Sequence, residues 1–242
     1  MRTRALSLWL FFITALAVQV AVHSLAHYLA DYSHRTIYAD FTEGIADWRE
    51  VSGLPYTDLI NQAGKTYGIS PELVAAVIKA ESSFQPRALS KAGAYGLMQV
   101  MPGTWRLVNS QAKICSGRHE GECGSDCFYN PELNIAVGTF YLSQLAKRYS
   151  GHAELAVASY NAGPGAVDKY GGVPPYAETT EYVERVVSYW YQVSGRRPPT
   201  GMAAESWLRL AYMLEWTMTA TLVAIMILGR YLYRRHKSFR WR

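Results

Sequence analysis

The pattern of apolar and polar residues predicts a mainly helical chain. Between residues 70 and 81, apolar side chains recur at intervals of three and four, which places them on one face of a helix. Ser70 and Pro71 are typical of a helix start, and Glu72 in the first turn meets the positive end of the helix dipole. The apolar face ends on an acid, Glu81. We therefore expect a helix over 70–81 with a carboxyl group at the end of its buried face.

The position of Glu81 suggests acid chemistry. Partial burial would raise the pKa of its carboxyl group, because ionisation in apolar surroundings is costly. A carboxylic acid that stays protonated near neutral pH can act as a general acid. The alternative is that Glu81 turns to solvent or pairs with Lys79 or Arg87. Periodicity alone favours neither interpretation.

The rest of the central region also shows helical spacing, separated by glycine- and proline-containing segments. Segment 95–101 is short and apolar, and it is either a strand or a turn. Loops are expected over 85–95, 113–128 and 170–175, and helices over 59–67, from 104 onward, and over 131–148, 153–159 and 179–193. With so little strand, the central region is predicted to be one α-rich globular domain.

Two apolar runs lie near the ends of the chain. Residues 5–22 carry no charge and follow Arg2 and Arg4, so they form either an uncleaved anchor or a cleaved signal peptide, and their length favours the anchor. Residues 210–229 contain a single charge, Glu215, with aromatic residues near both ends. This is typical of a transmembrane helix, and the alternative is a buried amphipathic helix.

The net charge of +5 is located at the ends of the chain. Eight of the 24 basic residues lie within 2–4 and 230–242, where there is no acid, which leaves 16 basic against 19 acidic residues elsewhere. No basic face for nucleic acid is indicated. By the positive-inside rule both ends lie in the cytoplasm, and the central domain faces the other side of the membrane. For a bacterial cell this is the periplasm, or the exterior if there is no outer membrane.

These features predict a linear domain organisation. The expected parts are an N-terminal anchor or signal peptide (1–30), a connector (31–55), a globular catalytic domain (56–193), a linker (194–206), a transmembrane helix (207–229) and a basic cytoplasmic tail (230–242).

Three cysteines lie close together in the sequence, at Cys115, Cys123 and Cys127. Outside the cytosol a disulfide bond would persist. His119 completes a spacing that zinc could use, but neighbouring glycines argue against the helix that would align it. A structural disulfide of undetermined pairing is expected, and a zinc site or no bond are the alternatives. A bridge from Cys115 would close the larger loop and stabilise more.

Several segments together resemble the soluble lytic transglycosylase (SLT) domain family over about residues 56–193. They occur in the family's order and spacing: Glu81-Ser82, Gly96 to Pro102, Asn130-Pro131 with Asn134-Ile135 and Gly138, Ala158 to Pro164, and Glu178-Thr179 with Tyr182-Val183. The resemblance implies a mainly α, lysozyme-like (α+β) globular domain, here flanked by an N-terminal and a C-terminal transmembrane helix.

The same resemblance implies an activity. The family cleaves the β-1,4 bond between N-acetylmuramic acid and N-acetylglucosamine in peptidoglycan and forms a 1,6-anhydro product without water. Glu81 would be the single catalytic acid and base. Ordinary glycosidases use two carboxylates, whereas this family relies on the N-acetyl group of its substrate. No metal and no cofactor are implied.

The resemblance also implies a set of substrate-binding residues. Ser90 and Gln99 would hydrogen-bond the sugar near the cleaved bond, Met101 would line the site, and Tyr160 would orient Glu81 or the N-acetyl group. The remaining implied residues are Glu178 and Tyr182, as glycan contacts on the last helix of the domain, and Asn161, for which the alternative is a role in shaping a turn. Each has a structural alternative, such as a core position for Met101 or Tyr182 and a turn cap for Ser90.

We therefore expect a membrane-anchored peptidoglycan lytic transglycosylase in the bacterial inner membrane. Its partners would be glycan strands, the membrane and an envelope-spanning secretion or conjugation apparatus that needs the wall opened locally, with no nucleic acid. The alternatives are a lysozyme-type peptidoglycan hydrolase and a non-catalytic wall-binding scaffold.

Overall fold

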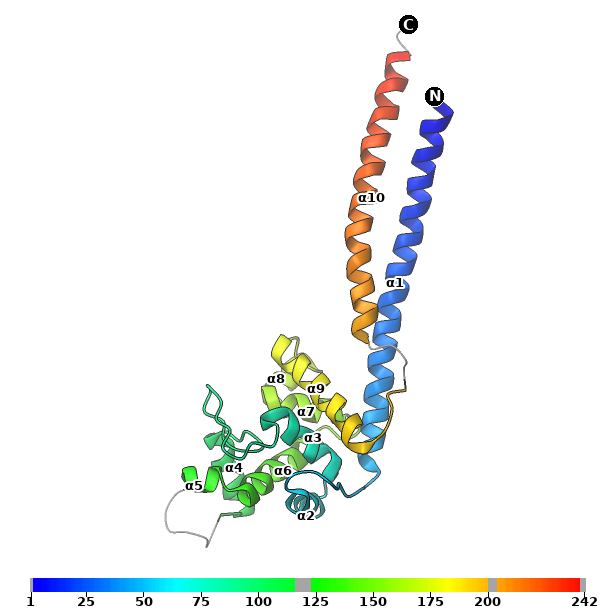
Figure 1. Cartoon of the computed structure of the whole chain (residues 1–242). Helices are drawn as coiled ribbons and strands as arrows, with labels where there is room; N and C mark the ends of the chain where they lie inside the picture. Colours follow the sequence, from blue (N-terminus) through cyan, green and yellow to red (C-terminus); the bar gives the residue numbers. More distant parts are fainter. Residues whose placement is uncertain (1, 116–122, 200–203, 240–242) are drawn as a thin grey trace. The chain divides into compact units, whose positions relative to one another are not determined.

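The computed structural model describes residues 2–115, 123–199 and 204–239 (Figure 1). Over these ranges the chain folds into α-helices and forms no strand. The first and last helices, α1 (Arg2–Ala46) and α10 (Ala204–Phe239), are long and apolar. The predicted mainly helical fold with a long apolar helix at each end is therefore confirmed.

The helices between them follow the predicted apolar periodicity. Their bounds are α2 (Thr57–Tyr67), α3 (Pro71–Ser82), α4 (Pro102–Ala112), α5 (Ser125–Phe128), α6 (Pro131–Arg148), α7 (Ala153–Ala162), α8 (Pro164–Tyr170) and α9 (Ala177–Ser194). Two short helices, α5 and α8, were not predicted, because neither is long enough to show a repeating apolar face.

The chain divides into two compact units. The first contains the described parts of residues 1–37 and 200–242, which contact each other in antiparallel fashion. His23 Nδ1 lies 3.2 Å from the carbonyl oxygen of Ala211, and Ala26 and Ala30 are buried. Both long helices are apolar enough, by length and composition alone, to cross a membrane.

The second unit, residues 38–199, contains a core in which α3 is central (Figure 1). Helix α3 packs against α2 and α9, while α6 packs against α2, α4 and α7. Every residue of α3 from Leu73 to Ile78 is fully buried. An apolar helix enclosed on all sides gives Glu81, in its last turn, a rigid support.

The last turns of α1 belong to this second unit. Phe41 is fully buried and meets Trp190 of α9 edge to face, with ring centroids 5.3 Å apart. The hydroxyl group of Tyr191 donates to Asp40 Oδ2 over 2.7 Å. The compact unit therefore begins well before residue 56, where the sequence places the start of the globular domain.

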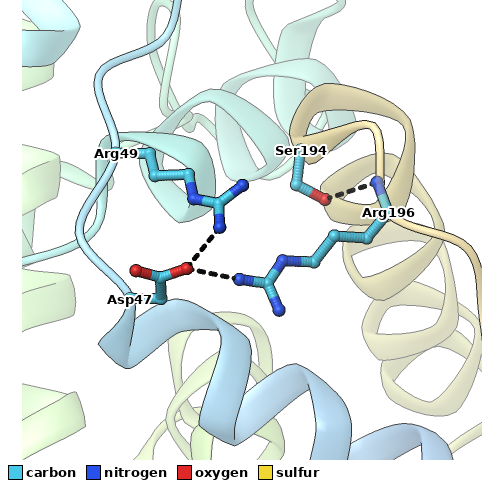
Figure 2. Close-up of polar contacts among 4 residues, drawn as sticks. All are labelled: Asp47, Arg49, Ser194 and Arg196. Carbon is cyan, nitrogen blue, oxygen red and sulfur yellow. Dashed lines mark hydrogen bonds and ion pairs between the residues drawn. The ribbon is translucent and has the colours of Figure 1, made fainter.

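A polar cluster joins the segment after α1 to the end of α9 (Figure 2). Asp47 Oδ2 accepts hydrogen bonds from Arg49 at 2.6 Å and from Arg196 at 2.8 Å, and Ser194 Oγ accepts from the Arg196 backbone amide at 3.4 Å. The charges of both arginines act on buried Glu72 at the start of α3. The cluster therefore offsets part of the cost of burying the Glu72 carboxylate, at the end of α3 that is remote from Glu81.

The segment predicted as a strand or a turn is a turn. Tyr95 forms isolated bridges with Leu89 and Val100, and Gly96 adopts a left-handed conformation at φ +75°. Asn134, fully buried on α6, accepts from the Met98 amide at 2.8 Å and donates to the Tyr95 carbonyl at 2.9 Å. Because Asn134 satisfies these backbone groups, the turn is held against α6 without a sheet.

Candidate active site

Glu81 lies in the last turn of α3, as predicted. Ser83 ends the helix in a left-handed conformation at φ 50°. The buried hydroxyl group of Ser82 donates to the Leu97 carbonyl at 2.7 Å, which ties the end of α3 to the turn around Gly96. The backbone around Glu81 is therefore held from two sides.

The Glu81 carboxyl group is hydrogen-bonded by a tyrosine from α9. The Tyr182 hydroxyl donates to Glu81 Oε1 over 2.7 Å, and the Tyr182 side chain is only 2% exposed. Of the alternatives raised by the sequence, Lys79 donates instead to Gln192 at 2.9 Å. The main polar contact of Glu81 is thus with a neutral phenol rather than with a cation.

The surroundings of Glu81 raise the pKa of its carboxyl group to about 7, chiefly through burial. The hydrogen bond from Tyr182 and the charge of Arg185 act in the opposite direction, while the negative charge of Glu178 adds to the rise. At a pKa near neutrality, both the acid and the carboxylate are populated at physiological pH. The group can therefore give a proton and later accept one.

Tyr160 lies close to Glu81 but contacts the turn. Its hydroxyl donates to the Met98 carbonyl at 2.9 Å, and burial, followed by the charge of Glu81, raises its pKa well above the usual value. Gly138 makes this approach possible, because a Cβ atom there would lie 2.5 Å from Met98 Sδ and 3.0 Å from the Tyr160 hydroxyl oxygen. Tyr160 is thus a neutral donor fixed beside the acid.

Gln99 and Ser90 shape the same turn. Gln99 has φ 46°, and its side-chain amide donates to the carbonyl oxygens of Gly96 at 2.9 Å and Ala88 at 3.2 Å. Ser90 Oγ accepts from the Ala94 amide at 3.0 Å. The structure therefore places both residues in the loop that follows α3, with part of each side chain exposed.

The other predicted residues are more dispersed. Asn161 Oδ1 accepts from the Thr179 hydroxyl at 2.8 Å, which links the end of α7 to the first turn of α9. Met101 is 41% exposed at the start of α4. Glu178 is exposed in the first turn of α9, where its charge acts on Glu81.

Sequence reasoning did not single out Arg185, whose charge lowers the pKa of Glu81. Helical spacing contained the signal, since Glu178, Tyr182 and Arg185 follow one another at intervals of four and three on α9. The sequence also contained no indication that the Tyr182 hydroxyl donates to Glu81, and its contact with the glycan stays a prediction.

No second carboxyl group was predicted beside Glu81, and Asp168 is occupied elsewhere. It accepts from Tyr149 at 2.8 Å and forms an ion pair with Arg148 at 2.5 Å. Among the residues that the structure describes, two groups of metal-ligand side chains converge, and neither includes Glu81. They are Cys115 with Cys123 and Cys127, and His23 with His27 and Glu215. His119, considered as a zinc ligand, lies outside the described residues.

These features define a helical domain in which the partly buried acid Glu81, with a pKa raised to about 7, receives a hydrogen bond from a tyrosine and lies beside the turn around Gly96. The sequence model of the Transglycosylase SLT domain family matches residues 58–183, which contain all of them. The chain belongs to this family. The predicted resemblance is thereby confirmed.

Individual relatives are similar over the same region. The soluble lytic murein transglycosylase of Salmonella typhimurium is 33% identical over 149 residues, which are 56% of this chain and 22% of the relative. Membrane-bound lytic murein transglycosylase C of Actinobacillus pleuropneumoniae is 34% identical over 157 residues, covering 57% of this chain and 40% of the relative. The chain thus spans well under half the length of these curated relatives.

Solved structures agree with the fold. The crystal structure of the 70 kDa soluble lytic transglycosylase of Escherichia coli superposes with a TM-score of 0.52 at 30% identity, over 59% of this chain and 25% of that chain. The lytic transglycosylase Slt of Pseudomonas aeruginosa was solved as an inactive glutamate-to-glutamine variant. It superposes with a TM-score of 0.51 at 29% identity, over 60% of this chain and 25% of that chain.

Proposed function

We propose that this protein is a peptidoglycan lytic transglycosylase and that Glu81 is its catalytic acid and base. The observation that carries the proposal is the Glu81 carboxyl group itself, with a pKa raised to about 7 and a 2.7 Å hydrogen bond from Tyr182. Membership of the Transglycosylase SLT domain family supports murein as the substrate.

The chemistry follows from a single group that titrates near neutrality. Protonated Glu81 gives its proton to the glycosidic oxygen as the bond from that oxygen to C1 of N-acetylmuramic acid breaks. The resulting carboxylate then accepts the proton of the C6 hydroxyl group while the C6 oxygen bonds to C1. The proton returns to Glu81 and no water is consumed. Because nucleophile and electrophile belong to one sugar, the second step gains from proximity.

The nearby polar residues take supporting roles in this proposal. Tyr182 positions the carboxyl group and, as a hydrogen-bond donor, stabilises its ionised form in the second step. Tyr160, Gln99 and Ser90 form the wall next to Glu81 that binds the sugar and its N-acetyl group. Met101, Asn161 and Glu178 border the glycan at greater distance.

Product analysis tests the reaction class. The full chain, purified in detergent, is incubated with isolated sacculi, and the released muropeptides are examined by mass spectrometry. Anhydro ends on N-acetylmuramic acid are expected. Reducing ends alone would identify a lysozyme-type hydrolase, and binding to sacculi without release of fragments would identify a wall-binding scaffold.

We further propose that both long helices anchor the enzyme in the inner membrane, with residues 38–199 outside the cytoplasm. The apolar length of α1 and α10 and the arginines at both ends of the chain support this arrangement. In spheroplasts, added protease should digest the central domain and spare the C-terminal basic tail. Alkaline carbonate should leave the intact chain in the membrane, whereas release would contradict the anchor.

Tethering would confine wall cleavage to one place. We therefore propose that the enzyme opens the wall locally for an envelope-spanning secretion or conjugation apparatus. A variant that carries neither anchor, with residues 1–37 replaced by a cleavable signal peptide and residues 200–242 deleted, should retain activity on sacculi but fail to support assembly of that apparatus. Normal assembly with the released form would contradict this role.

A further inference from the structure

Three cysteine side chains outside the proposed active site converge on one point. Cys115 follows α4, Cys123 precedes α5, and Cys127 lies within α5. Their Sγ atoms all lie within 4.8 Å of one another. Cys115 and Cys127 are 2% and 7% exposed, whereas Cys123 is partly open to solvent.

The surrounding backbone fixes the two buried cysteines. The Cys115 amide donates to Asn109 Oδ1 at 2.9 Å, which links the backbone of Cys115 to the last turn of α4. The Cys127 amide donates to the Gly124 carbonyl at 3.0 Å. Next to Cys127, Phe128 packs on buried Trp105 with ring centroids 4.9 Å apart. The backbone at both buried cysteines is therefore held in place by contacts that do not depend on a bond between their sulfur atoms.

We propose that this cluster is an exchangeable disulfide site, in which Cys123 pairs with Cys115 or Cys127 and the remaining cysteine stays a thiol beside the bond. Three sulfur atoms in mutual reach can form only one disulfide at a time. Each pairing needs a movement of only a few ångströms to reach bonding distance. A thiol next to a disulfide can attack it and exchange partners.

The oxidation uses a disulfide as oxidant. Cys123, the accessible member, attacks the oxidant as a thiolate and forms a mixed disulfide, releasing one thiol of the oxidant. A buried cysteine then loses its proton and attacks the Cys123 sulfur, releasing the second thiol. Two protein thiols are oxidised to one disulfide, and the oxidant disulfide is reduced to two thiols. Burial raises the pKa of Cys115 to about 12, so Cys115 attacks slowly.

The site is coupled to the turn beside Glu81. Phe128, adjacent to Cys127, accepts a hydrogen bond at its carbonyl oxygen from Asn134 Nδ2 at 2.9 Å. Asn134 also holds the Met98 amide and the Tyr95 carbonyl. A disulfide to Cys127 would thus restrain the segment against which the turn is built. The relevance of this disulfide to catalysis rests on the proposed function, whereas the formation of the disulfide does not depend on that function.

Thiol mapping tests the inference independently of activity. The full chain in detergent is reduced, equilibrated with glutathione disulfide, quenched in acid, alkylated and digested. We expect one disulfide per chain that includes Cys123, one alkylated thiol, and both pairings in the same sample. Three alkylated thiols, a bond between Cys115 and Cys127 alone, or stoichiometric retained zinc without a disulfide would each overturn the proposal.

Serine variants serve as matched controls. Cys115→Ser should leave only the bond between Cys123 and Cys127, and Cys127→Ser only the bond between Cys115 and Cys123. Cys123→Ser should slow oxidation by about tenfold or more, because both remaining thiols are buried. Equal oxidation rates for all three variants would contradict the role of Cys123 as the accessible member. An inactive protein with the expected map would refute only the proposed function.

Discussion

Glu72 and Glu81 lie in the first and last turns of α3, and burial raises the pKa of both. Glu72 is 4% exposed, and no hydrogen-bond partner for its Oε2 atom occurs in the described part of the chain. The charges of Arg196 and then Arg49 counteract the effect of burial on its pKa, and the Trp190 side chain adds a smaller effect in the same direction. Glu81 instead keeps part of its surface open and receives a hydrogen bond from Tyr182.

The difference shows why a buried acid is not by itself an active site. Both carboxyl groups are costly to ionise, but only Glu81 lies at the end of α3 that is tied to the loop carrying Gln99 and Ser90. Glu72 lies near Asp47 and two arginines that join the start and the end of the globular unit. The raised pKa of Glu72 therefore concerns the stability of the fold, whereas the raised pKa of Glu81, at the other end of α3, has a proposed use in catalysis.

The largest expected effect is a difference in enzymatic activity between variants of Glu81 and of Glu72. Glu81→Gln should lower the release of muropeptides from sacculi by about 10³-fold, within the range by which general acids contribute. The matched variant Glu72→Gln, at the other end of the same helix, should stay within about twofold of wild type, since it touches no step of the reaction. Comparable losses in both variants would remove the distinction.

The second prediction concerns stability against pH. Because the pKa of Glu81 rises from 4.5 to about 7 on folding, the folded protein retains this proton longer than the unfolded chain. Its contribution to the free energy of unfolding therefore falls as pH rises from about 4.5 to 7, by about 2 kcal/mol after allowance for its solvent contact. Glu81→Gln should accordingly gain stability over wild type at pH 8 but not at pH 4.

Thermal unfolding at several pH values measures this gain. Glu72→Gln should change in the same direction, since the pKa of Glu72 is also raised. The two variants therefore resemble each other in stability while differing in activity. A stability difference that is independent of pH in the Glu81→Gln variant would contradict a raised pKa at this position.

The third prediction tests the hydrogen bond that distinguishes Glu81. Tyr182→Phe removes the donor, and since that bond lowers the pKa of Glu81, the pKa should rise. We expect about a tenfold loss of kcat/KM, of the order of one charge-assisted hydrogen bond. The decline of activity above pH 7 should move to higher pH.

The control is another buried tyrosine of α9. Tyr191→Phe removes a hydrogen bond of the same length, 2.7 Å, to Asp40, but at the end of the unit remote from Glu81. Its pH profile should match that of wild type. If both variants lost activity with unchanged profiles, Tyr182 would be a packing residue and not a positioning residue.

The smallest effect is expected at the Glu72 end. Arg196→Met should lower the free energy of unfolding by about 1 kcal/mol, because it removes a partly exposed ion pair with Asp47 and leaves Glu72 with less compensation. Activity per folded molecule should not change. Arg49→Met, at a more exposed side chain, should cost less when both are compared by urea denaturation.

Much of the fold was predictable because its signals are local. The helix start at Ser70 and Pro71 and the apolar spacing up to Glu81 depend on neighbours within a few residues. The start of α6 at Asn130 is also local, and there the side chain caps the helix by accepting from the Leu133 amide at 3.1 Å, whereas the Ser70 side chain makes no cap hydrogen bond. Helix α8 could not be predicted from the sequence in this way, since seven residues cannot show a full apolar repeat.

The sequence by itself determined the longer helices, the apolar ends and the acid at the end of α3, together with the family to which the motifs belong. Only the tertiary structure decided that Tyr182, 101 residues away, donates a hydrogen bond to Glu81. It also decided that buried Glu72 lies near charged side chains from both the start and the end of the globular unit. Periodicity reports which face of a helix is buried. It does not report which distant side chain lies opposite, because that depends on how whole helices pack.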